Sequence, residues 1–198
     1  MALFAGRRPG LDCTLVNTRP PSAFLGAGAL ELPPGPLAFH LARVVVLAAG
    51  GWALLGRFAP RDVLVLCELA SRFAGGEPPP RGLPPERAGA FLDALRRAVP
   101  PATLDHLADL GRDSAAELAT LDPVALAADV ERSATRLALL HTGDLHGALL
   151  VQARLPRPGS APVEDGTVPL SRPDLAELAR FALSDPYLEM RARMLGWS

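Results

Sequence analysis

Two ionisable side chains occur in sequence contexts that could support metal-dependent chemistry. His40 lies in an apolar stretch, Leu37-Ala-Phe-His-Leu-Ala-Arg-Val44, and Glu131 begins the later segment Glu131-Arg-Ser-Ala-Thr135. Imidazole and carboxylate groups are both ligands of zinc in proteins. One of each is fewer than the three protein ligands that a catalytic zinc site normally has. The pair therefore indicates either an incomplete metal site or two ordinary helix residues.

Both side chains are expected to lie on helices. The segment Pro33-Pro34-Gly35-Pro36 interrupts regular structure, and after it the apolar residues recur at helical spacing. The expected helices cover residues 37–49, 60–73, 86–99, 102–110, 114–121, 123–141, 144–153, 173–183 and 186–195. Asp122-Pro123 and Asp185-Pro186 each predict a capping carboxylate followed by a proline at the first helical position.

Residues 12–32 form the one convincing β region, read as one or two short hairpin-like strands. The predicted fold class is mainly α (α+β), a helical domain with a small β-hairpin edge. We expect a main domain over residues 1–154, a linker rich in proline and glycine over 155–170, and a C-terminal helical pair over 171–198 that packs on the main domain.

Composition excludes several classes of protein. The 20 basic residues nearly balance the 21 acidic ones, so a net charge of -1 gives no electrostatic reason to bind nucleic acid. Every basic residue is Arg, and Ile is absent, which is typical of GC-rich bacterial coding. The longest uncharged piece of the most apolar stretch, Val44 to Gly56, is too short for a membrane span. With only two cysteines and no secretory leader, the expected location is cytoplasmic.

The layout of the two segments resembles the zinc metallopeptidases of the gluzincin type, in particular the HtpX and CAAX prenyl endopeptidase group. In that family an edge strand precedes a helix bearing H-E-x-x-H, and a later helix bears E-x-x-x-D. Here the β region precedes His40, while Glu131 and Thr135 match the positions of the later motif. The resemblance covers Cys13 to Ala153.

The resemblance implies that the catalytic motif has been lost. In H-E-x-x-H, two histidines one turn apart hold zinc, and the glutamate between them activates the bound water. Leu41 stands at the base position and Val44 at the second ligand position. Thr135 stands where the family has the Asp expected to orient a ligand histidine. His40, Glu131 and Thr135 are then vestigial site positions, with no catalytic or metal-binding set and no cofactor.

We therefore expect a non-catalytic protein-interaction or scaffold module, a pseudoenzyme, whose partner is another protein. Two alternatives stay open. One is a metal-dependent hydrolase in which His40 and Glu131 recruit a third ligand, such as His141 or Asp129. The other is a helical partner-binding domain unrelated to peptidases. A site that keeps the family geometry would bring His40 and Glu131 within hydrogen-bonding distance across two packed helices.

The C-terminal segment is the candidate interface. It combines an aromatic pair, two methionines and several arginines, the residue types enriched at interface cores. The candidate interface residues are Tyr187, Met190, Met194 and Trp197. The competing interpretation is that this helix docks on its own domain.

Overall fold

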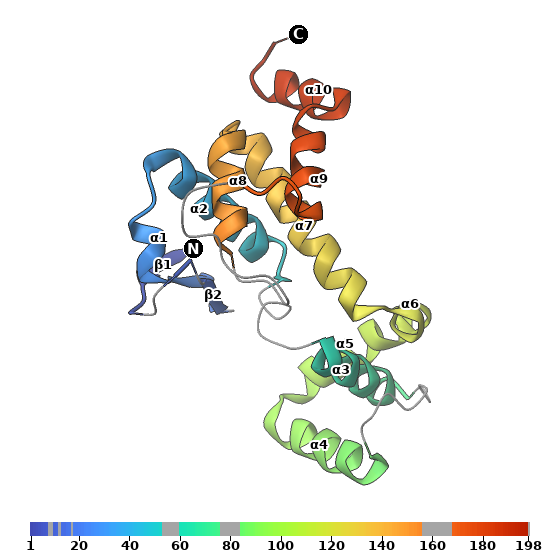
Figure 1. Ribbon diagram of the computed structural model, residues 1–198. Helices are drawn as coiled ribbons and strands as arrows, with labels where there is room; N and C mark the ends of the chain where they lie inside the picture. The colour runs from blue at the N-terminus through green and yellow to red at the C-terminus, as the bar shows by residue number, and fades with distance from the viewer. Residues whose placement is uncertain are drawn as a thin grey trace. The chain divides into compact units, whose positions relative to one another are not determined.

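The computed structural model describes residues 1–7, 10–11, 13–16, 18–52, 60–75, 84–155 and 168–197. These residues form ten helices and one three-stranded sheet, so the predicted fold class, mainly α with a small β edge, is confirmed (Figure 1). The elements are β1 (Ala2–Ala5), β2 (Cys13–Val16), β3 (Ser22–Leu25), α1 (Ala27–Leu30), α2 (Pro34–Ala49), α3 (Pro60–Phe73), α4 (Pro85–Ala98), α5 (Pro101–Asp113), α6 (Ala115–Thr120), α7 (Pro123–Thr142), α8 (Leu145–Arg154), α9 (Pro173–Ala182) and α10 (Asp185–Met194). None of the described helices is both long and apolar enough to cross a membrane.

The chain divides into two compact units. Unit 1 comprises Met1–Arg57 together with Asp129–Ser198, and unit 2 comprises Phe58–Ala128. Unit 1 therefore holds the sheet, α1, α2, most of α7 and the helices α8 to α10, while unit 2 holds α3 to α6. Most of the linker predicted at residues 155–170 lies outside the described residues, so the boundary expected there stays a prediction.

The sheet of unit 1 has the strand order β1-β3-β2, with β1 parallel and β2 antiparallel to β3. Side chains alternate between the two faces of a strand, so the register assigns each residue to a face. The inner face carries the buried residues Leu15, Ala23 and Leu25, and β2 contacts α2. The outer face carries Phe24, which is exposed.

Two parts of the β region differ from the sequence-based expectation. The strand β1 lies at residues 2–5, outside the predicted region 12–32, because its sequence Ala-Leu-Phe-Ala has no alternation of polar and apolar residues and no β-branched residue. Residues 27–30 form the short helix α1 and not a strand. The antiparallel pairing of β2 with β3 accounts for the rest of the predicted region.

Helix α2 begins at Pro34, within the run predicted to precede it. Proline is tolerated in the first turn of a helix because its missing N–H would have no partner there. The first turn of α2 also lies close to the first turn of α8. A Cβ atom at the buried Gly147 would be 3.0 Å from the backbone nitrogen of Pro36, so this crossing favours glycine.

The helix boundaries follow local capping chemistry. The Asp122 carboxylate accepts hydrogen bonds from the backbone N–H groups of Val124 and Ala125, at 2.9 and 3.1 Å, which confirms the predicted cap. The cap predicted at Asp185 is wrong, because α10 begins at Asp185 itself and the N-cap is Ser184. Between α7 and α8, Gly143 adopts a positive φ of 69°.

Within unit 1, the C-terminal pair α9–α10 packs on the preceding helices through the contact of α9 with α8. Leu175 and Leu178 of α9 are buried. Three arginines also tie the pair to the helices beside it. Arg172 donates to the backbone carbonyls of Ala153 and Gln152 at the end of α8, Arg191 donates to those of Leu140 and His141 at the end of α7, and Arg136 pairs with Glu177. Cationic groups at helix C-termini complement the helix dipole.

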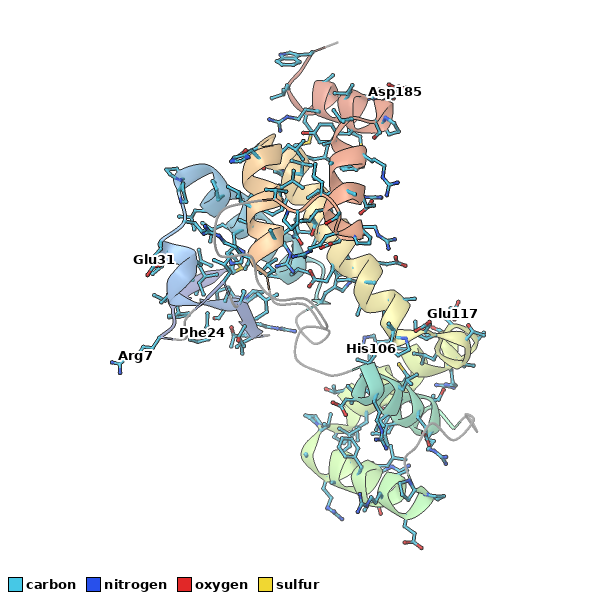
Figure 2. All side chains as sticks on the ribbon, viewed as in Figure 1. Arg7, Phe24, Glu31, His106, Glu117 and Asp185 are labelled. Atoms are coloured by element: carbon cyan, nitrogen blue, oxygen red, sulfur yellow. The ribbon has the colours of Figure 1, made fainter. Side chains whose placement is uncertain are left out.

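Unit 2 has a small core of its own. Leu69 of α3 is buried with Ala88 and Leu92 of α4, and Val65 and Phe73 pack against them. Helix α5 also crosses α3 closely, since a Cβ atom at Gly111 would be 3.0 Å from the carbonyl oxygen of Ala70. His106 of α5 is exposed (Figure 2).

Candidate functional site

The candidate site lies in unit 1, where a side chain of α2 reaches α7. Arg43 is 8% exposed, and its guanidinium donates a hydrogen bond to the carboxylate of Glu131 to form an ion pair. The Glu131 side chain is 37% exposed, so the pair lies at the edge of the core. The Arg43 charge strengthens this hydrogen bond, and one oxygen of the Glu131 carboxylate is thereby already bonded.

His40 lies one turn before Arg43 on α2 and is completely buried. Neither ring nitrogen has a hydrogen-bond partner among the described residues. Burial, with a smaller contribution from the Arg43 charge, lowers the pKa of His40 to about 4. The imidazole is therefore neutral at pH 7.

A second polar contact lies one turn further along α7. Thr135 and Gln152 are both buried, and the Gln152 side-chain amide donates to the Thr135 hydroxyl at 3.0 Å. Glu131 and Thr135 lie four residues apart and so share a face of α7. Each of them bonds to a different helix, Glu131 to α2 and Thr135 to α8.

The sheet contributes Cys13, which lies on the inner face opposite Leu25. Burial is the main cause that raises the pKa of its thiol to about 11, against the lowering effect of Arg43 and with a small raising effect of Glu131. Cys13 is therefore a thiol at neutral pH, whereas nucleophilic catalysis and metal binding both require the thiolate.

The structure brings part of the predicted site together and rearranges the rest. His40, Glu131 and Thr135 all belong to unit 1, as the sequence interpretation requires. The hydrogen bond expected between His40 and Glu131 is not formed: both His40 nitrogens lack a partner among the described residues, and the carboxylate bonds to Arg43. The sequence did not predict Arg43 as the partner of Glu131, nor did it point to Cys13 or Gln152.

The two candidates for a third metal ligand are not drawn into this site. Asp129 is exposed and bonds to Arg132 at 2.9 Å. His141 is exposed near the end of α7, ten residues beyond Glu131, which corresponds to about 15 Å along a helix. Among the described residues, no group of three or more His, Cys, Asp or Glu side chains is arranged to hold a metal ion.

The four candidate interface residues of the C-terminal segment divide into two groups. Tyr187 is buried, with its ring edge-to-face on Phe181 at a centroid distance of 5.4 Å. Met190, Met194 and Trp197 are exposed. The helix thus docks on its own unit through Tyr187 and presents the other three side chains to solvent. Figure 2 marks its first residue, Asp185.

Comparison with known proteins gives no relative: no family model, curated protein or solved structure matches the chain at a significant level.

The burial of neutral His40 predicts acid-dependent stability. In the unfolded chain its pKa is near 6.5, so between pH 6.5 and pH 4 the unfolded state binds more protons than the folded state. The free energy of unfolding contributed by His40 is therefore constant above pH 6.5 and falls as the pH decreases through this window. We expect a loss of about 3 kcal/mol by pH 4.

The measurement is urea unfolding of the wild type and the His40→Leu variant at pH 7 and pH 4. The other titrating groups are common to both proteins, so the difference between their pH dependences isolates His40. The wild type should lose more stability than the variant. Equal losses would show that His40 is not held neutral by its surroundings.

Proposed function

We propose that this chain is a non-catalytic protein-interaction module built on a fold derived from a gluzincin-type zinc metallopeptidase. The observation that carries the non-catalytic part is the ion pair of Arg43 with Glu131. It gives the one carboxylate assigned to the vestigial site a partner that is part of the chain itself.

The ion pair opposes zinc binding in two ways. A divalent cation at Glu131 would have to displace Arg43, and the mostly buried guanidinium would then lose the partner that offsets its desolvation. The displaced positive charge would also remain close to the metal. His40, the other vestigial ligand position, is neutral and could donate a lone pair, but it would be a single ligand.

The residue types around His40 further oppose hydrolysis. Leu41 follows His40 at the position of the general base, and a leucine side chain cannot accept a proton from water. Asp129 lies two residues from Glu131, and residues at that spacing on a helix do not face the same side. The alternative hydrolase would therefore need a ligand and a base from elsewhere.

The zinc content of purified protein tests both parts of the proposal: that the site no longer binds zinc, and that the fold derives from a metallopeptidase. Wild-type protein purified in the presence of zinc should hold far less than one zinc per chain. The Arg43→Ala/Val44→His variant frees Glu131 and restores the second histidine of the motif. If the helices keep the metallopeptidase geometry, it should bind one zinc per chain, detected by metal analysis and by a zinc-dependent rise in the thermal unfolding midpoint.

The Arg43→Ala variant is the matched control, because it frees Glu131 without supplying a ligand. Stoichiometric zinc in the wild type that disappears in His40→Ala would contradict the non-catalytic proposal. A folded double variant that binds no more zinc than Arg43→Ala would contradict the derivation from a metallopeptidase.

The support for an interaction role comes from α10 and the residues that follow it. Met190 and Met194 lie four residues apart and so on one face of α10, while Trp197 follows that helix and is 71% exposed. Exposed tryptophan and methionine are costly to leave in water and are characteristic of contact surfaces. Tyr187 and Arg191 of the same helix attach it to the rest of unit 1.

Affinity capture from the native host tests this surface. The Met190→Asp/Met194→Asp variant changes residues that are 38% and 48% exposed. The matched control is Leu107→Asp/Leu110→Asp on α5, where the two leucines are 40% and 48% exposed. A partner should be retained by the wild type and by the control and lost by the α10 variant. A set of bound proteins that is the same for all three would contradict the assignment of α10 as the interface.

A further inference from the structure

The edge strand β1 has features that none of the functions above uses. It is the outer strand of the sheet, and in the described part of the chain it pairs with β3 alone. Its hydrogen bonds run to that side: the N–H of Ala2 donates to Pro21 at 2.8 Å, and the N–H of Gly6 donates to Leu25. In a parallel pair alternate residues bond to the neighbouring strand. The backbone groups of Leu3 and Ala5 therefore point away from β3.

The two large apolar side chains of β1, Leu3 and Phe4, are also exposed. Leu3 lies on the inner face in register with Ala23, which is fully buried, yet Leu3 is 49% exposed. On the outer face Phe4 is 47% exposed and stacks on Phe24 of β3, with ring centroids 5.0 Å apart. The exposed position of Phe24 on the sheet is visible in Figure 2. Both faces of the sheet thus end in uncovered apolar side chains at β1.

Apart from its short length, β1 lacks the usual protections of an edge strand between Met1 and Gly6. Proteins commonly guard such edges with charged side chains, proline or a bulge. This segment, Met-Ala-Leu-Phe-Ala-Gly, contains no charged side chain and no proline, and β1 pairs in continuous register with β3. An extended backbone is the one structure whose donors and acceptors fit such an edge.

We propose that β1 pairs antiparallel with β1 of a second copy of this chain, so that two three-stranded sheets join across a two-fold axis. The backbone fixes the register. Leu3 and Ala5 carry the free donors and acceptors, so Leu3 of each copy lies opposite Ala5 of the other and the pair exchanges both hydrogen bonds. Phe4 then lies opposite Phe4 on the axis.

In this register each face of the joined sheet brings the same residues of the two copies together, as a two-fold interface requires. On the outer face, Phe4 of each copy stacks on its own Phe24, so four aromatic rings form one row across the joined sheet. On the inner face, Leu3 meets Ala5 of the other copy. No side chain from Leu3 to Ala5 is charged, so the side chains paired across the axis do not repel each other. The same register places the Met1 amino group opposite Arg7 at each end of the pairing, and this repulsion weakens the contact.

The size of the contact sets the expected strength of the dimer. One strand of four residues covers much less surface than the standard interface of about 1,600 Å². The dimer should therefore be weak and in reversible equilibrium with the monomer. A dimer would carry two copies of the proposed interface of Met190, Met194 and Trp197. Two linked interfaces would bind a multivalent partner more tightly than one.

Sedimentation equilibrium of the full chain, with no residue added before Met1, measures this association from micromolar to millimolar concentration. The Ala5→Pro variant removes an N–H that faces the free edge and leaves the bonds of Ala2 and Gly6 to β3 in place. The Ala5→Val variant keeps that N–H and is the control. The dissociation constant should rise by about tenfold or more in Ala5→Pro and change little in Ala5→Val.

A second pair of variants does not alter the backbone. Phe4→Glu places two carboxylates opposite each other on the axis and should abolish the dimer. Phe91→Glu is its control, because Phe91 on α4 is 48% exposed and the change in charge is the same. A wild type that stays monomeric at millimolar concentration would overturn the proposal. A dimer that survives in both Ala5→Pro and Phe4→Glu would overturn it as well, since the contact would then lie elsewhere.

Discussion

The ion pair between Arg43 of α2 and Glu131 of α7 is the interaction on which the account of unit 1 depends. It links two segments that are 88 residues apart in the chain. It also explains the state of its neighbours: the Arg43 charge adds to burial in keeping His40 neutral, and it partly offsets the effect of burial on the thiol of Cys13. The pair matters most to Arg43, because removing Glu131 would leave the mostly buried guanidinium without the carboxylate that offsets its desolvation.

Most of the helical fold could be predicted from the sequence, because its signals are local. The apolar period and the flanking prolines placed α3 at its observed bounds, and Asp122 marked the start of α7. The failures occurred where local signals are weak. β1 has no alternation of polar and apolar residues, α1 has only four residues, and β1 forms because β3 supplies its hydrogen bonds. At Asp185 two helix starts, one residue apart, satisfy the same sequence pattern.

The candidate site was only partly predictable, because a site depends on which side chains meet. Residue types pointed to His40 and Glu131, and the resemblance to the metallopeptidase motif added Thr135. The partner of Glu131 could not be read from them, since several arginines lie near these positions in sequence and only the fold brings Arg43 to the carboxylate. The same reasoning applies to Gln152, the single glutamine of the chain, whose contact with Thr135 depends on how α8 meets α7. Tyr187 was assigned to an interface by its type, whereas the structure buries it against Phe181.

A double-mutant cycle on the ion pair tests the central claim most directly. The free energy of unfolding is measured for the wild type, Arg43→Met, Glu131→Gln and the double variant, all at pH 7. The account predicts a favourable coupling energy of about 1 kcal/mol or more, because Arg43 is mostly buried although Glu131 is partly exposed. A coupling energy near zero would contradict it, since Glu131 would then be a solvated carboxylate that Arg43 does not hold.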